Sequence, residues 1–206
     1  MGFFRAILAK QEISDRAFQL TKEVIRFSQG NYAAWAYRRK LIDALKCPLS
    51  EEFDWLNSIG LDMEKNYQIW HHRRCVAEII GKDMDLEGEM AFLGSIFSSD
   101  AKNYHAWTYR IWLVERFQLW KDQMDFAENL LDDDVENNSI WSYRYFLLNA
   151  SPVGTFSTHA PGTPEFVGEQ VKYVMEQRWT ERMDNEAMWV YLRGMLANSE
   201  EEAAAS

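Results

Sequence analysis

The segment Asp100–Arg110, DAKNYHAWTYR, combines a cation with the start of a helix. Asn103 is a good N-cap, because its side-chain oxygen can accept a hydrogen bond from free backbone N–H groups of the first helical turn. Lys102 precedes it, so its ammonium group can lie beside the positive end of the helix. That combination suits a diphosphate. When diphosphate leaves in a reaction, its negative charge grows, and a fixed cation would stabilise that charge. On residue type alone a solvated lysine is the commoner case, and Lys65 occupies the same place in an earlier copy of the pattern.

The pattern is Asn-x-x-x-Trp-x-x-Arg, and offsets of four and seven residues put the three side chains on one face of a helix. Its five copies begin at Asn31, Asn66, Asn103, Asn137 and Asn185, with Trp35, Trp70, Trp107, Trp141 and Trp189 four residues later. The arginines of the first four copies are Arg38, Arg73, Arg110 and Arg144, and Leu192 stands there in the fifth. We expect the five tryptophans in the core. The arginines could be surface charges, but their fixed position favours buried or interface hydrogen bonds.

The spacing of the tryptophans predicts a solenoid of helical hairpins. They are 35, 37, 34 and 48 residues apart, which is typical of repeats that stack as antiparallel helix pairs. A plain amphipathic helix precedes each Asn-Trp-Arg helix, and no segment alternates with the period of a strand. We predict an all-α fold of about five hairpins in one domain, 1–206. The repeats are expected near 14–46, 50–81, 84–119, 122–150 and 165–197, and a Pro- and Gly-containing loop at 151–164 explains the longest spacing.

Composition limits the classes of function. The net charge of −10 disfavours a nucleic-acid surface, and a hydrophobic content of 47% supplies a core. With only Cys47 and Cys75, the sequence fits a reducing cytosol, so we expect a cytoplasmic protein. No apolar run is long enough to span a bilayer, and Ala6 stands where a myristoylation signal has Ser or Thr.

A metal site is the one other chemistry that residue types suggest. His71, His72 and Cys75 lie close together in the sequence. Adjacent histidines point to different faces of a helix, and a fourth ligand is missing, so we predict no metal on this chain. The run Asp132–Asp134 is expected to be a solvated face or turn.

Three stretches of the sequence resemble a known protein family. KNYQIWHHRR (65–74), DAKNYHAWTYRIW (100–112) and ENNSIWSYRYF (136–146) resemble the α subunit shared by protein farnesyltransferase and type I geranylgeranyltransferase. The resemblance covers nearly the whole chain. It implies a right-handed α-α superhelix around a β subunit that holds zinc, with magnesium also used by the complex and no cofactor on this chain. The cytoplasmic heterodimer would transfer a farnesyl or geranylgeranyl group to the cysteine of a C-terminal CaaX sequence, and this subunit alone would be inactive.

The resemblance also implies roles for particular residues. Lys102 would be catalytic by contacting the prenyl diphosphate, Tyr104 would line the same region, and His105 would lie near the C-terminal end of the peptide. Tyr67 and Asn137 match further substrate-binding positions at the interface.

The sequence departs from the family pattern at its ends. The Pro-rich acidic segment usual at the start and further helix pairs usual at the end are missing, so we expect a form truncated at both ends. Leu192 weakens the fifth motif. Two alternatives stay open: the α subunit of Rab geranylgeranyltransferase, and a non-catalytic helical-repeat adaptor.

Overall fold

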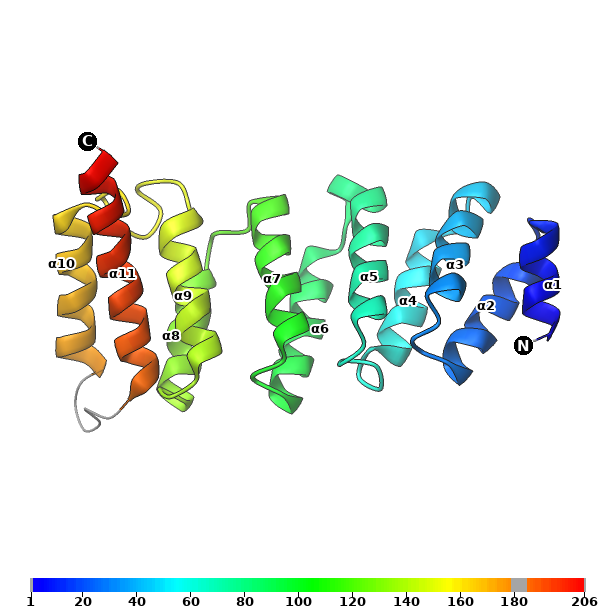
Figure 1. The fold of residues 1–206 in the computed structure, drawn as a ribbon, viewed down its shortest axis with the longest axis horizontal. Coiled ribbons are helices and arrows are strands. Elements are labelled where there is room, and N and C mark those ends of the chain that lie inside the picture. Colours follow the sequence, from blue (N-terminus) through cyan, green and yellow to red (C-terminus); the bar gives the residue numbers. More distant parts are fainter. Residues whose placement is uncertain (1, 179–184, 206) are drawn as a thin grey trace. The chain divides into compact units, whose positions relative to one another are not determined.

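The computed structural model describes residues 2–178 and 185–205, and they form helices joined by turns and loops (Figure 1). No strand occurs in these two stretches, so the predicted all-α fold of helical hairpins is confirmed. The predicted fifth repeat, 165–197, includes residues 179–184, which lie outside the described residues. The helices are α1 (Gly2–Lys10), α2 (Asp15–Phe27), α3 (Tyr32–Leu45), α4 (Leu49–Gly60), α5 (Tyr67–Ile80), α6 (Leu86–Ser99), α7 (Tyr104–Phe117), α8 (Gln123–Asp133), α9 (Asn138–Ala150), α10 (Pro164–Tyr173) and α11 (Glu186–Ala205). A 3-10 turn covers Gly81–Asp83 and a π-helical turn covers Val174–Arg178.

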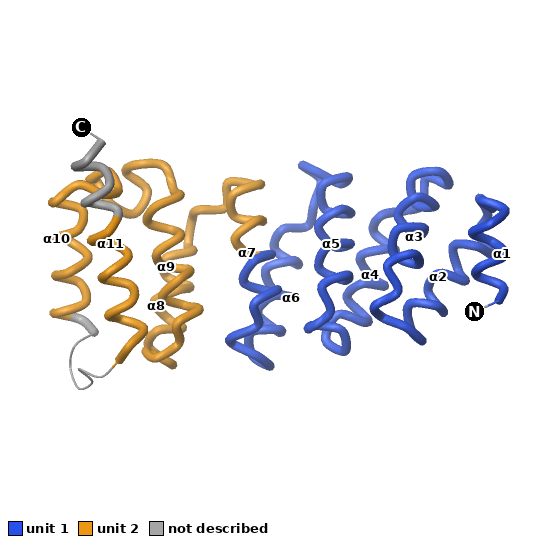
Figure 2. The backbone as a smooth tube through the Cα atoms, viewed as in Figure 1, with its two compact units in different colours: residues 1–109 blue, residues 110–206 orange. Residues whose placement is uncertain are grey.

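The chain divides into two compact units, residues 1–109 and residues 110–206 (Figure 2). In the first unit α2 packs against α3, α4 against α5, and α3 against α5. In the second unit α8 packs against α9, and α11 packs against both α9 and α10. The boundary falls within α7, and the single domain predicted over 1–206 stays a prediction.

The second helix of every hairpin begins at the asparagine of the motif, as its capping tendency predicts. In each case the side-chain oxygen accepts a hydrogen bond from a first-turn N–H group. The donors are the N–H groups of Ala34, Gln68, Ala106, Ser139 and Ala187, at 2.8–3.1 Å from the caps Asn31, Asn66, Asn103, Asn137 and Asn185. These caps fix where the helices start, and so fix the side chains around them.

A shared carbonyl joins neighbouring hairpins. In the first unit the Trp70 indole Nε1 donates to the carbonyl oxygen of Glu64 at 2.7 Å, and the Asn103 Nδ2 donates to the same oxygen at 3.3 Å. One backbone acceptor thus satisfies the tryptophan of one repeat and the cap of the next. The second unit repeats the arrangement with Trp141, Val135 and Asn185.

The motif arginines are buried and form hydrogen bonds to the next hairpin, which confirms the interior role expected for them. Arg38 forms two hydrogen bonds with Glu52, at 2.6 and 2.5 Å. Its guanidinium carbon also lies 4.0 Å from the ring centroids of Phe18 and Trp55, so the cation is stacked as well as paired. The later repeats use the pairs Arg73–Glu89, Arg110–Gln123 and Arg144–Gln170.

The expectation that all five tryptophans are buried is wrong for Trp189, which is 40% exposed, whereas the other four are buried. The reason is packing beyond the motif. Trp141, for example, is covered by the rings of Tyr173 and Tyr191 from the following hairpin, with centroids 6.4 and 5.0 Å away. Trp189 lies on α11, and its exposed fraction shows that its indole is covered less completely than that of Trp141.

Candidate functional site

The start of α7 combines a fixed backbone with exposed side chains. Asn103 is buried, and its side chain is held by the N–H group of Ala106 and the carbonyl of Glu64. Tyr104, the next residue, is 74% exposed, and Lys102 is exposed on the other side of the cap. A rigid cap thus presents a cation and a phenol to solvent, where both can reach a ligand.

Lys102 and Lys65 occupy equivalent places in two repeats, but their surroundings differ. The Lys65 ammonium lies 3.4 Å from Oδ2 of Asp100, whose Oδ1 accepts a hydrogen bond from the Lys102 backbone N–H at 3.0 Å. The Lys102 ammonium has no hydrogen-bond or ion-pair partner within the described stretches. Its charge is therefore available to an anion, whereas the charge of Lys65 is partly satisfied.

Backbone donors lie beside that cation. The side-chain oxygen of Asn103 accepts a hydrogen bond from the N–H group of Ala106, and its backbone carbonyl accepts one from the N–H group of Trp107. The N–H groups of Tyr104 and His105 have no acceptor in the part of the chain that is described. Open first-turn N–H groups at the positive end of a helix favour an anion.

An aromatic row connects the starts of α5 and α7. The Tyr67 ring stacks on His71 with centroids 5.8 Å apart and planes 5° from parallel. The same Tyr67 ring lies 6.3 Å from the ring of His105, which lies 5.7 Å from that of Tyr104. The structure therefore brings Tyr67, Tyr104 and His105 together, and their predicted part in substrate binding stays a prediction.

His71 is a fourth member of the row, although its residue type and spacing suggest it only as a metal ligand in the sequence. Burial, followed by the nearby charges of Arg39 and Arg74, lowers the pKa of His71. The imidazole is therefore held neutral near pH 7, which suits stacking. The spacing of four residues between Tyr67 and His71 on a predicted helix is the signal that could have found the pair.

Asn137 differs from the other predicted site residues. It belongs to the second unit, is fully buried, and caps α9 by accepting a hydrogen bond from the Ser139 N–H at 3.0 Å. Its role is thus to fix the beginning of α9, and its predicted part in substrate binding stays a prediction.

The histidine and cysteine cluster of α5 has other partners. His72 is buried and its Nε2 lies 2.8 Å from Oε1 of Glu52, while the Cys75 Sγ lies 3.8 Å from Nε2 of His71. Within residues 2–178 and 185–205 no group of three or more His, Cys, Asp or Glu side chains could hold a metal ion. Among the same residues, no helix combines the length and apolar character required to span a membrane.

Comparison with known proteins places these features in a family. A family model described as the protein prenyltransferase alpha subunit repeat matches residues 14–45, 49–80, 86–117 and 120–151. A protein farnesyltransferase/geranylgeranyltransferase type-1 subunit alpha from Candida albicans is 36% identical over 202 residues, which cover 95% of this chain and 63% of that protein. The chain therefore spans less than two thirds of the length of this relative.

Two further comparisons agree with this result. The geranylgeranyl transferase type-2 subunit alpha of Saccharomyces cerevisiae is 24% identical over 199 residues, covering 90% of this chain and 59% of the yeast protein. A chain in the solved structure of Candida albicans protein geranylgeranyltransferase-I complexed with GGPP superposes with a TM-score of 0.82 and 34% identity, covering 97% of this chain and 66% of that one. The repeats, the fold and the identity together establish that this chain belongs to the protein prenyltransferase α-subunit family.

Proposed function

We propose that this chain acts as the α subunit of a heterodimeric protein prenyltransferase that transfers farnesyl or geranylgeranyl to the cysteine of a C-terminal CaaX sequence. The similarity to type-1 α subunits, 36% over 95% of the chain, supports this class over the type-2 enzyme, at 24% over 90%. The observation that carries the proposal is the unpaired Lys102 ammonium beside the open N–H groups of Tyr104 and His105.

In the proposed reaction the cysteine thiol loses its proton to solvent, and its sulfur forms a bond to the first prenyl carbon as the carbon–oxygen bond to diphosphate breaks. The electron pair of that bond leaves with the diphosphate, whose negative charge grows in the transition state. The Lys102 ammonium and the backbone N–H groups of Tyr104 and His105 would form hydrogen bonds to the diphosphate. These bonds would strengthen as its charge grows, so they would stabilise the transition state more than the ground state. Tyr104 would donate its phenolic hydrogen to a diphosphate oxygen.

The remaining predicted residues would bind and position. The exposed ring of Tyr67 and the half-buried ring of His105 would offer apolar and polar contacts to the prenyl chain and to the C-terminal end of the peptide. Asn137 would act indirectly, because its buried side chain fixes the start of α9. We assign zinc and magnesium to the rest of the complex and a β subunit as the partner, and we place the complex in the cytoplasm.

The test uses the chain co-purified with a prenyltransferase β subunit. Single-turnover transfer from radiolabelled prenyl diphosphate to a CaaX peptide should slow by about 10- to 100-fold in Lys102→Ala. The matched control, Lys65→Ala, should change the rate by less than about twofold, because Lys65 is paired with Asp100. An unchanged rate in Lys102→Ala would refute the catalytic role.

The same preparation distinguishes the alternatives. Transfer to a Rab protein and not to the CaaX peptide would place the chain with the type-2 enzymes. Failure to bind any prenyltransferase β subunit, while other partners are recovered, would favour a non-catalytic adaptor.

A further inference from the structure

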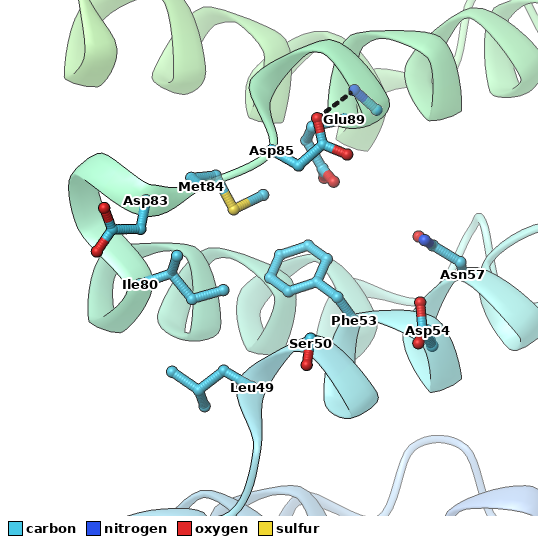
Figure 3. A pocket seen from close by; sticks show the side chains of 11 residues that line it. Leu49, Ser50, Phe53, Asp54, Asn57, Ile80, Asp83, Met84, Asp85 and Glu89 are labelled. Carbon is cyan, nitrogen blue, oxygen red and sulfur yellow. Dashed lines mark hydrogen bonds between the residues drawn. The ribbon is translucent and has the colours of Figure 1, made fainter.

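A cavity of about 390 Å³ lies in the first unit, between α4, the turn after α5 and the start of α6 (Figure 3). It is far from the aromatic row. Ile80 lines it at the end of α5, whereas Tyr67 begins that helix, and thirteen residues of helix separate them by about 20 Å. The volume is within the range of pockets that bind small molecules or single large side chains.

The floor of the cavity is apolar. Leu49 and Phe53 come from α4, Ile80 from α5, and Met84 from the turn before α6. Figure 3 shows the Phe53 ring, Ile80 and the Met84 sulfur pointing toward one another in the middle of the space. These side chains can bury an aliphatic group that enters from solvent.

The rim is acidic. Asp54, Asp83 and Asp85 line the cavity and are exposed, and only Asp85 has a hydrogen bond there, accepting from the Gly88 N–H at 2.9 Å as the cap of α6. The carboxylates of Asp54 and Asp83 have no hydrogen-bond or ion-pair partner in the described part of the chain. None of the described residues that line the cavity is Lys, Arg or His, so the rim attracts cations.

A deeper carboxylate does not add to that charge. Glu89 also lines the cavity, but it is buried, and Arg73 Nη2 donates to its Oε2 at 2.8 Å. The Arg73–Glu89 pair is therefore neutral as a whole and closes the inner wall. The attraction comes from the exposed aspartates, which an incoming group can reach without breaking the core.

The negative charge of the rim limits which kind of molecule can bind in the cavity. A second copy of this chain, a nucleic acid and an anionic membrane would all bring negative charge, since the chain itself has a net charge of −10. A polyamine would satisfy the rim and leave the apolar floor exposed. We propose that this cavity docks a basic peptide segment of a partner protein, with an aliphatic side chain over Phe53 and Met84 and Lys or Arg side chains at Asp54 and Asp83.

The test measures binding of a fluorescein-labelled peptide, GSKRLKRSG, to the full chain by fluorescence anisotropy at low salt. Asp54→Asn/Asp83→Asn should weaken binding about threefold to tenfold, because two exposed ion pairs are lost. The matched control, Asp43→Asn/Asp125→Asn, makes the same change in net charge at exposed residues outside the cavity and should alter binding by less than about twofold. Circular dichroism checks that all variants are folded.

Two further peptides test the chemistry of the occupant. GSKRSKRSG, without the leucine, should bind several-fold more weakly, and GSEELEESG should not bind. The proposal fails if GSKRLKRSG does not bind, if both double variants weaken binding equally, or if removal of the leucine has no effect. Prenyl transfer by the complex should be unchanged in Asp54→Asn/Asp83→Asn, so the outcome is independent of the proposed function.

Discussion

The ion pair between Arg73 and Glu89 provides a sharp test of how the repeats hold together. Both side chains are buried, and the guanidinium donates through Nε and Nη2 to the two carboxylate oxygens, the second at 2.8 Å. Nη2 also donates to Oδ1 of Asn57, and the guanidinium carbon lies 3.7 Å from the ring centroid of Phe92. Changes at Glu89 therefore affect a desolvated cation whose other contacts remain.

The arginine pairs of the other repeats suggest how much stability substitutions at Glu89 should cost. Arg110 has a glutamine, Gln123, as its partner from the next hairpin, with a hydrogen bond of 2.7 Å. Arg144 has Gln170 at 2.7 Å in addition to the Glu128 carboxylate at 2.9 Å. Glu89→Gln thus imitates a pairing that this chain already uses, and we expect it to cost about 1–2 kcal/mol through the loss of charge assistance. Glu89→Leu removes the acceptors and should cost about 3 kcal/mol, the lower end for a broken buried pair, because Asn57 is still present.

The measurement is urea unfolding followed by circular dichroism, with amide hydrogen exchange in α5 and α6 as a local readout, because the chain has two compact units. Glu87→Gln, an exposed residue in the first turn of α6, is the control and should change stability by less than about 0.5 kcal/mol. If Glu89→Leu is no less stable than Glu89→Gln, the guanidinium does not require an acceptor, and the reasoning about the arginine of every repeat is wrong.

Two other predictions concern the same unit. Burial lowers the pKa of His72 despite its hydrogen bond to Glu52, so the unfolded chain takes up a proton first, and stability should fall as the pH drops below about 6.5. In His72→Gln, urea midpoints at pH 8, 6.5 and 5 should depend less on pH, and an unchanged dependence would contradict this assignment. Gly60→Ala should destabilise by about 1–2 kcal/mol, because the added Cβ would lie 2.6 Å from the Phe92 ring. Gly94→Ala, with no atom within 4 Å of its Cβ, should stabilise α6 by about 0.5–1 kcal/mol, and equal thermal shifts in both variants would count against the packing argument.

Features that depend on local spacing could be predicted from the sequence. Asn103 caps its helix and Arg110 is buried on the same face as Trp107, because both consequences follow from helical geometry and residue type. The exposure of Trp189 could not be predicted in this way. Burial of an indole in these repeats depends on side chains of the following hairpin, and the motif says nothing about them.

The candidate site was only partly accessible to sequence reasoning. Lys65 and Lys102 have the same place in the motif, and only the fold shows that Asp100 lies beside the Lys65 ammonium. The stacking of Tyr67 on His71 follows from helical spacing, whereas its contact with His105 joins two helices and requires the packing of α5 against α7. Gly81 and Asp85 mark the end of α5 and the start of α6, but the cavity beside α4 depends on how the turn between them packs against α4, which local sequence does not specify.

The motif separates residues that hold the fold from residues that are free to do chemistry. The tyrosines that follow the caps of the first three repeats, Tyr32, Tyr67 and Tyr104, are 70%, 57% and 74% exposed, although the cap before each is fixed by hydrogen bonds. Lys102→Ala and Tyr104→Phe should therefore leave the free energy of unfolding within about 0.5 kcal/mol of the original value while reducing prenyl transfer. Asn103→Ala should cost about 1–2 kcal/mol, because it removes both the cap and the bond to the shared carbonyl. Urea unfolding and single-turnover transfer, measured on the same three variants, check this division. A loss of stability in Lys102→Ala as large as in Asn103→Ala would mean that the exposed positions also carry structure, and lower activity in that variant would then be no evidence for contact with the diphosphate.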